Sequence, residues 1–421
     1  MKSRASFFIA LRYLWGRAHE GGRYLRGAAA GIAVSLIPII VTLIVADGMI
    51  RGIIDRYIEL GTGHIQVFNV IDPVNLESTA ETVMAVDGVR GAWPEKRSIG
   101  VLVGRGGRTG ASIRAVEPSF WEDPGSAYFL EIIEGTARFE TDRDMLLGGS
   151  LASAIGAQIG DTVRLMTITT GAGGNNIPRT SPFVVRGIVS SGYHELDALL
   201  CIITWEGGRQ ILSAELSSAS LLVKIDDPYR NISSFAWSLR SALGAGYNVL
   251  SWQDLLRSQY SSYESTRQLL LFIMALIVVV AAVNVSFATS MLVLERQRDI
   301  AVLKVTGAGV KGVTNVFLWG SFLTGLTGGI IGISIGLLIG KNINPLIRSL
   351  ERQLTFFSSL FRGGEVRILD PDFYLETIPI IIDWNTVFLI GLFTVFCSVI
   401  ASWIPARRAG KLKPMELLRK C

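Results

Sequence analysis

Charge, histidine and cysteine are all scarce in this sequence. Only 18% of its 421 residues are charged, and it holds three histidines and three cysteines. The histidines are far apart, so they indicate no catalytic or metal-ligating arrangement, and structural or surface roles are favoured for His64 and His194. Cys201 is the single cysteine of the segment 51–268. An intramolecular disulfide is therefore excluded within that segment.

The motifs of nucleotide and nucleophile chemistry are also missing. The run GLLIGKN ends in Gly340 and Lys341, but asparagine follows where a phosphate-binding loop requires serine or threonine. No Gly-x-Ser-x-Gly elbow is present. The sequence therefore predicts no catalytic, cofactor-binding or metal-binding residues in this chain.

Four long windows carry no charge at all. A hydrocarbon core of ~30 Å is spanned by about 20 helical residues, and each window is at least that long. The first follows a basic arm, but no small-residue cleavage site precedes Asp47, which favours a retained anchor over a removed leader. The first uncharged window ends at Ala46, and the predicted transmembrane helices are 27–50, 269–294, 312–340 and 384–406.

Lysine and arginine gather in the segments that flank these windows. Residues 1–26, 295–311 and 407–421 hold six, four and six basic residues, whereas 51–268 holds 19 basic and 24 acidic residues. Because positive charge marks the cytoplasmic side, we predict a cytoplasmic basic arm, coupling loop and tail, in that order, with both termini cytoplasmic. The segment 51–268 and the short loop 341–383 are then periplasmic. This asymmetry is a topology signal, and nucleic-acid binding explains it poorly.

The segment 51–268 is long enough to bury its own core. Alternating apolar runs between turn signals predict strands in GHIQVFNV, SIGVLVG, ASIRAV, DTVRLMTITT, PFVVRGIVS and SASLLVKID. MLLGGSLASAIGAQIG and SSFAWSLRSALG have helical spacing. The prediction is an α+β domain. Its last part, from Ser251 to Gln268, has no proline and is expected to enter the second membrane helix as one continuous rod.

Two glycine-rich segments each allow two interpretations. TGAGGNNIPRTSP is either a mobile hairpin loop or a protruding arm that contacts a carrier or partner. Small residues at four-residue spacing in 312–340 let helices approach closely, either within the chain or between subunits. The candidate contact residues of the first segment are Thr170, Gly171, Asn175, Pro178 and Pro182.

The segment 295–311 begins directly after an apolar window and is both charged and half apolar. ERQRDIAVLKVTGA can form a short helix that Gly307 ends, because glycine tolerates the left-handed conformation after a helix. The helix either rests on lipid headgroups or docks a cytoplasmic partner through apolar anchors and a charged rim. The candidate docking residues are Glu295, Arg296, Asp299, Ile300, Leu303, Lys304 and Gly307.

Several of these stretches resemble one known family. ERQRDIAVLKVTGAG and IPARRAGKLKPMELLRK resemble the loop and C-terminal motifs of the FtsX-like permeases of MacB-type ABC transporters. LLGGSLASAIGAQIGDTVRLMT resembles part of their outer domain. VLSWQDL and FYLETIPIIIDW are similar to segments of the lipoprotein-releasing Lol permeases. The resemblance covers nearly the whole chain and implies an α-helical membrane protein with four transmembrane helices and a large α+β periplasmic domain between helices 1 and 2.

The resemblance also implies partners and a substrate. A non-catalytic permease of this kind pairs with a second permease subunit, identical or related, and with a cytoplasmic ABC ATPase dimer that binds ATP and Mg; the permease itself carries no cofactor. It extracts lipid-anchored lipoproteins from the inner membrane and passes them to a periplasmic carrier. The alternatives are an export permease for drugs or peptides, an FtsX-like regulator of cell-wall hydrolases and a receptor without an ATPase.

A lipoprotein extractor requires an apolar cavity for acyl chains. The first two predicted helices are rich in large apolar residues, and four of those in the second recur at three- and four-residue steps along one face. That face either lines the cavity or packs only within the subunit. The candidate cavity residues are Leu270, Ile273, Ile277, Val280, Asn284, Ser35 and Thr42.

Overall fold

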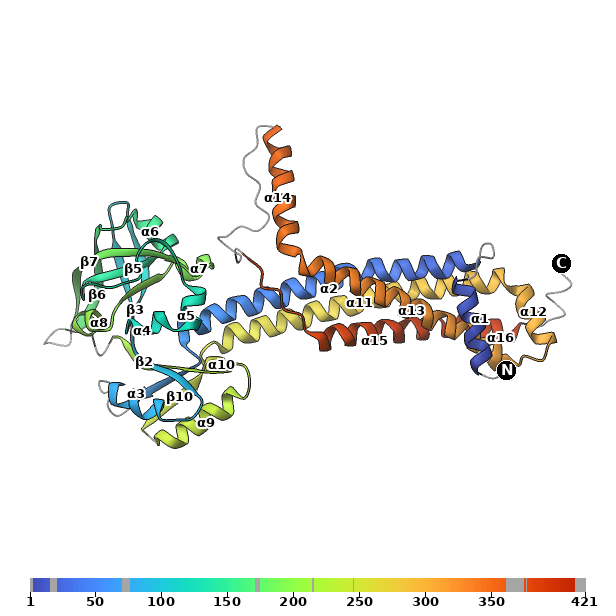
Figure 1. The fold of residues 1–421 in the computed structure, drawn as a ribbon, viewed down its shortest axis with the longest axis horizontal. Helices are drawn as coiled ribbons and strands as arrows, with labels where there is room; N and C mark the ends of the chain where they lie inside the picture. The colour runs from blue at the N-terminus through green and yellow to red at the C-terminus, as the bar shows by residue number, and fades with distance from the viewer. Residues whose placement is uncertain are drawn as a thin grey trace. The chain divides into compact units, whose positions relative to one another are not determined.

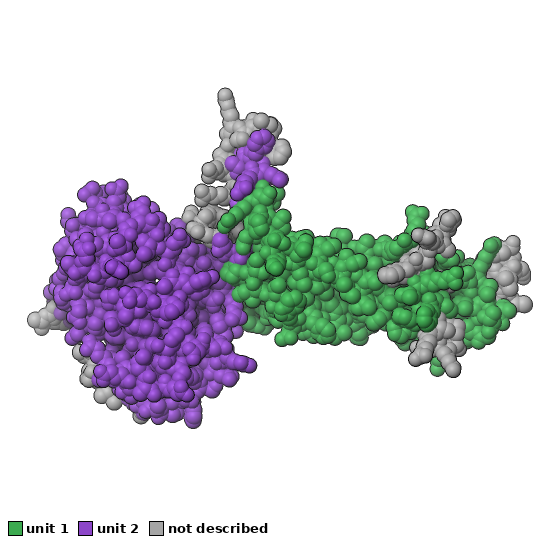
Figure 2. Space-filling model, viewed as in Figure 1, with its two compact units in different colours: residues 1–48, 263–350, 379–421 green, residues 49–262, 351–378 purple. Residues whose placement is uncertain are grey.

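The computed structural model describes residues 3–15, 21–69, 76–170, 175–213, 216–244, 246–360, 375 and 377–412. The chain divides into two compact units, which Figure 2 shows in different colours. Unit 1 comprises residues 1–48, 263–350 and 379–421, and unit 2 comprises residues 49–262 and 351–378.

Unit 1 is built from helices (Figure 1). Four of the described helical segments are long and apolar enough to cross a membrane: Arg23–Thr62, Arg257–Glu295, Val310–Lys341 and Trp384–Lys411. The helices that contribute to unit 1 are α1 (Ser3–Trp15), α2 (Gly21–Arg56), α11 (Arg257–Glu295), α12 (Gln297–Val305), α13 (Val310–Lys341), α14 (Ile343–Leu360), α15 (Trp384–Ala401) and α16 (Trp403–Lys411).

The glycines of α13 pack against α2 within the chain. A Cβ atom added to Gly328 would lie 2.6 Å from the carbonyl oxygen of Ala29, and one added to Gly332 would lie 2.8 Å from that of Ala33. Only glycine permits this approach of the two backbones. Of the two interpretations of the small-residue spacing, the structure favours packing within the subunit.

Unit 2 carries all the described strands, and six of them close into a barrel. Following the pairs around the ring gives β2-β3-β8-β5-β7-β6, and β6 pairs with β2 again. The β3–β8 and β5–β7 pairs are parallel and the rest are antiparallel. The barrel strands are β2 (Val89–Val103), β3 (Arg108–Val116), β5 (Asp144–Gly148), β6 (Thr162–Thr170), β7 (Asn176–Ser190) and β8 (Leu200–Thr204).

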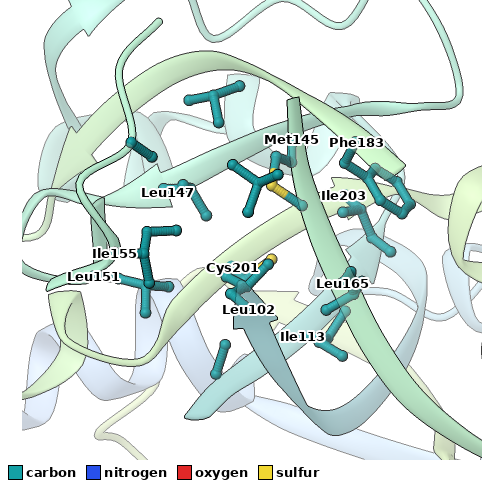
Figure 3. Close-up of a cluster of buried hydrophobic side chains, with 14 of the residues drawn as sticks. Leu102, Ile113, Met145, Leu147, Leu151, Ile155, Leu165, Phe183, Cys201 and Ile203 are labelled. Atoms are coloured by element: carbon teal, nitrogen blue, oxygen red, sulfur yellow. The ribbon is translucent and has the colours of Figure 1, made fainter. Parts of the chain in front are cut away.

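Apolar side chains from every barrel strand fill the interior. Leu102, Ile113, Met145, Leu165 and Phe183 are among those that point toward one another in Figure 3, and each is at most 1% exposed. The thiol of Cys201 lies in the same core, and burial raises its pKa to about 12. Because the thiolate is the reactive form, this cysteine is chemically inert.

The sheet continues beyond the barrel as β2-β9-β1-β10. Its added strands are β9 (Ser218–Ile225), β1 (Ile65–Asn69) and β10 (Tyr247–Ser251), and α3 (Leu76–Met84) and α9 (Ile232–Leu243) contact them. At the far end of the sheet, β4 (Glu131–Gly135) pairs with β7. The expected α+β fold is confirmed for unit 2, and SSFAWSLRSALG is helical as predicted.

Four sequence expectations differ from the structure. MLLGGSLASAIGAQIG begins as strand β5, and only α6 (Gly149–Ile155) is helical, because the buried run before Gly148 pairs with two neighbouring strands. The loop 341–383 contains α14, and the arm 1–26 contains α1. The rod from Ser251 is interrupted: a capping box at Ser251 starts the short helix α10 (Trp252–Leu255), and α11 begins at Arg257.

Candidate functional site

The segment 295–311 forms a helix of its own, α12, set off from α11 at Arg296. Gly307 has φ 95°, and the amides of Gly307 and Ala308 donate to the carbonyls of Lys304 and Leu303 at 3.1 and 2.9 Å. This pair of bonds is the Schellman arrangement that closes a helix. The prediction that Gly307 ends the helix is confirmed.

Ile300, a candidate docking residue, does not face outward. It is 1% exposed and lies in a core cluster with Val293, Val313 and Ala406. The exposed apolar residues of α12 are instead Val302, at 61%, and Val305, at 70%. These two lie three positions apart and therefore share a face of the helix. The three-residue spacing of Val302 and Val305 is the sequence signal that indicates this outward face.

The charged residues predicted around α12 take different roles. Arg296 donates to Asp299 at 3.3 Å within the same turn. Lys304 donates to the backbone carbonyl of Leu412, so it ties α12 to the chain just beyond α16. Glu295 is exposed and Leu303 is half-buried. The outer face of α12 therefore combines Val302 and Val305 with flanking charge, while Lys304 fixes the helix in place.

The run IPARRAGK forms α16 and packs on the start of α13. Ala406 and Ala409 are fully buried, and a Cβ atom on Gly410 would lie 2.5 Å from the hydroxyl of Thr314. Small residues therefore line the buried side of α16. The two arginines, Arg407 and Arg408, are exposed on its other side. The motif thus fixes α16 against α13 and leaves its basic residues free for contacts outside the chain.

The candidate cavity face of α11 is largely unpartnered. Ile273, Ile277 and Val280 are 44%, 38% and 58% exposed, and Leu270 is half-buried beside the core cluster of α2 and α11. For the three exposed residues, packing only within the subunit is excluded. On α2, Ser35 is half-buried and Thr42 is exposed.

Asn284 continues the same face of α11 toward the middle of the apolar window. Its side chain is exposed, and its amide has no hydrogen-bond partner among the described residues. A polar side chain on an otherwise apolar helix face is a candidate for contact with a group outside the chain.

A second polar site joins three helices at the other end of the apolar windows. The guanidinium of Arg267 on α11 donates to Asp47 on α2 at 2.8 Å and to Asp383, the N-cap of α15, at 3.0 Å. Asp383 also accepts the hydroxyl of Thr386 at 2.6 Å. One arginine of α11 therefore links α2 to the N-terminal end of α15. Because the three residues are far apart in the chain, no local sequence pattern indicates this site.

The glycine-rich segment at 170–182 is mostly strand. β7 begins at Asn176, and Pro178 and Pro182 pair with Ile168 and Arg164 of β6, so the predicted loop is shorter than expected. Prolines are tolerated there because this part of β7 pairs only with β6. Thr170 ends β6, Asn175 precedes β7, and Gly171 lies outside the described residues.

Comparison with known proteins finds a matching family model for each of two parts of the chain. A model of the FtsX-like permease C-terminal region matches residues 271–414, and a model of the MacB-like periplasmic core domain matches residues 27–231. The chain belongs to the FtsX-like, MacB-type family of ABC transporter permeases. Its four apolar helices agree with a multi-pass protein of the inner membrane.

The relatives that match from end to end are lipoprotein-releasing system transmembrane proteins. LolC of Neisseria meningitidis is 27% identical over 98% of both chains, and LolC of Xylella fastidiosa is 28% identical over 98% of both. LolE of Haemophilus influenzae is 23% identical, again over 98% of both. The periplasmic region of MacB from Actinobacillus actinomycetemcomitans aligns with 47% of this chain and 94% of that structure, at 18% identity and a TM-score of 0.32.

Proposed function

We propose that this chain is a permease subunit that extracts lipoproteins from the inner membrane and hands them to a periplasmic carrier, driven by an ATPase on a separate chain. The observation that carries the proposal is the end-to-end similarity to LolC and LolE, which covers 98% of both chains. In this proposal both termini and α12 are cytoplasmic, and unit 2 is periplasmic.

The extent of each match separates this function from macrolide export. MacB of Wolinella succinogenes, named as an ATP-binding and permease protein, is 22% identical over 92% of this chain, but the match covers only 57% of that relative. The Lol relatives, named as transmembrane proteins, are covered almost completely. The match over almost the full length of the Lol relatives favours lipoprotein release, and the drug-export alternative ranks second. ATP and Mg would then bind to the partner.

The geometry supports two separate contact surfaces in unit 1, one on α12 and one on α11. Val302 and Val305 offer an apolar contact to a cytoplasmic ATPase dimer, with Arg298 exposed beside them. The exposed face from Ile273 to Asn284 offers an apolar wall to acyl chains and one amide to the carbonyl groups that join them to the lipoprotein. Each buried methylene contributes about 0.8 kcal/mol, so a triacylated anchor leaves a bilayer only when work is done on it. A second permease subunit would supply the opposite wall.

The experiment is site-specific crosslinking in proteoliposomes that contain the permease pair, the ATPase and a lipoprotein, with a photoreactive label on one introduced cysteine of the permease. Ile277→Cys, labelled and illuminated, is expected to crosslink to the lipoprotein before ATP is added and not after. The matched control is Ile331→Cys on α13, an isoleucine that is 50% exposed but lies on another helix. Crosslinking of both positions to bulk lipid only, in every nucleotide state, would remove α11 as the cavity wall.

A further inference from the structure

An apolar groove of 470 Å³ runs along one side of the α13–α15 pair, and neither the site on α12 nor the face of α11 uses it. Its lining is entirely apolar and includes Leu326, Gly329 and Ile330 from α13 and Trp384, Phe388 and Gly391 from α15. The volume is typical of ligand pockets, which hold ~300–1,000 Å³. All of these residues belong to unit 1.

The groove exists because Gly329 leaves a space between α13 and α15, whereas glycines near it are in close contact with the facing helix. A Cβ atom on Gly325 would lie 2.9 Å from the hydroxyl of Ser398, and one on Gly391 would lie 3.1 Å from Ile333. Gly329 lies one helical turn from both Gly325 and Ile333, yet a Cβ atom there would meet nothing within 4 Å. The two helices therefore contact each other at Gly325 and Gly391, and Gly329 lines the unfilled space between these contacts.

The position of the groove on two apolar helices indicates that it lies within the membrane. Both walls belong to helices long and apolar enough to cross a membrane. Trp384, which is 66% exposed, lies at one end of the lining, directly after Asp383 and its ion pair with Arg267. Tryptophan and charge at a helix end mark the headgroup level of a bilayer. The groove therefore begins at the membrane surface and descends into hydrocarbon.

Its length matches one leaflet. The lining follows α15 from Trp384 to Val395, which is about 16 Å at 1.5 Å per residue, or half of the ~30 Å hydrocarbon core. Water is excluded from such a space because the lining offers it no hydrogen bonds. We propose that the groove binds one acyl chain of a membrane phospholipid, with the headgroup at the Trp384 end, as a lipid that completes the packing of α15 on α13.

Gly329→Leu tests the proposal, because the new side chain enters the groove without meeting another atom at its Cβ. Gly31→Leu on α2 is the matched control: a Cβ atom there also meets nothing within 4 Å, and Gly31 is not part of the lining. Both variants and the unchanged chain are reconstituted in nanodiscs of a phospholipid with a diazirine at the end of one acyl chain. After illumination, the crosslinked peptides are identified by mass spectrometry.

The expected result is a label on the 384–395 segment of the unchanged chain and of Gly31→Leu, and its loss in Gly329→Leu. Thermal unfolding of each variant checks that the helices still assemble. Gly329→Ala, which fills less of the groove, is expected to keep part of the label if Gly329→Leu fails to assemble. Equal labelling of all variants would overturn the proposal. So would labelling of this segment only by a photoreactive lipoprotein, or its crosslinking to a second permease chain in place of lipid.

Discussion

Unit 2 buries full charges, whereas the polar side chains that unit 1 buries among its described residues are all serines and threonines. In unit 1 a hydroxyl bonds to the carbonyl four residues earlier in its own helix: Thr289 donates to Val285 at 2.8 Å and Ser398 to Thr394 at 2.8 Å. In unit 2, Lys224 is fully buried among Glu59, Asp123 and Ser126, at 2.6–2.9 Å.

The difference follows from what each environment can supply. A helix satisfies a hydroxyl locally, so no neighbour is required and the group can sit anywhere in an apolar span. A charge requires several partners at once, and in unit 2 the partners come from different segments of the fold. Unit 1 meets this requirement with Arg267, whose two aspartate partners lie on α2 and at the N-cap of α15. Loss of a buried hydroxyl in unit 1 should therefore cost little stability, whereas loss of a buried charge in unit 2 should cost much more.

The largest expected effect is that of Lys224→Met. The change removes the cation and leaves Glu59 and Asp123 buried beside an apolar chain, which costs about 3–5 kcal/mol when a buried pair is broken. Urea unfolding of unit 2 in the detergent-solubilised chain, followed by tryptophan fluorescence, measures the loss. The control is Arg209→Met, which removes the exposed pairs with Glu77 and Glu206 at 3.4 Å and is expected to cost about 0–1 kcal/mol. Equal losses in the two variants would show that the burial of Lys224 adds nothing to the cost of losing its ion pairs.

Low pH should destabilise unit 2 through the same cluster of buried charges. Burial opposes ionisation of Asp123, but the hydrogen bond and charge of Lys224 outweigh it and lower the pKa of the carboxyl below its usual 3.8. A depressed pKa contributes stability that is present above pH 3.8 and is lost as the pH falls through the lower folded value. Unfolding midpoints measured downward from pH 5 should therefore fall below about pH 4. This acid sensitivity should be weaker in Lys224→Met, and an unchanged slope would rule out this carboxyl as its source.

A smaller effect is expected for Arg267→Gln. The amide cannot replace two ionic contacts, but the arginine side chain is 30% exposed, so the loss is expected to be about 1 kcal/mol. The measurement is the thermal unfolding midpoint of the reconstituted chain, with Arg407→Gln, an exposed arginine on α16, as the control. Added salt should reduce the difference in unfolding midpoint between the unchanged chain and Arg267→Gln, because salt screens partly exposed ion pairs. A midpoint as insensitive as that of Arg407→Gln would show that α2, α11 and α15 are held together there by packing alone.

Sequence periodicity and charge predicted the features that depend on local chemistry. They did not predict features that depend on contacts between residues far apart in the chain. The four uncharged windows became long apolar helices, and Gly307 ends α12, since both depend on local chemistry. Ile300 was misplaced because α13 and α16 cover it, which the spacing within 295–311 does not reveal. β8 was missed because its run, LCIIT, is fully buried and lacks the alternation of a half-buried strand.

The smallest expected effect is that of Thr289→Val, which removes a hydroxyl shared by three helices. Thr289 lies 3.1 Å from the hydroxyls of both Ser321 and Ser402. Hydrogen bonds between membrane helices contribute only about 0.6 kcal/mol on average, because the remaining groups find other partners. Here Ser321 keeps its bond to Phe317 at 3.1 Å, so it is not left unsatisfied.

The control for Thr289→Val is Ser290→Ala, whose hydroxyl bonds only to Ser286, at 2.9 Å, within its own helix. Thermal unfolding of the reconstituted chain should separate the two variants slightly, with Thr289→Val the less stable. A loss as large as that of Lys224→Met would mean that the hydroxyls of unit 1 act as a network comparable to the charges of unit 2. In that case local bonding to the helix would not explain why the membrane helices carry buried serines and threonines, and the contrast between the two units would fail.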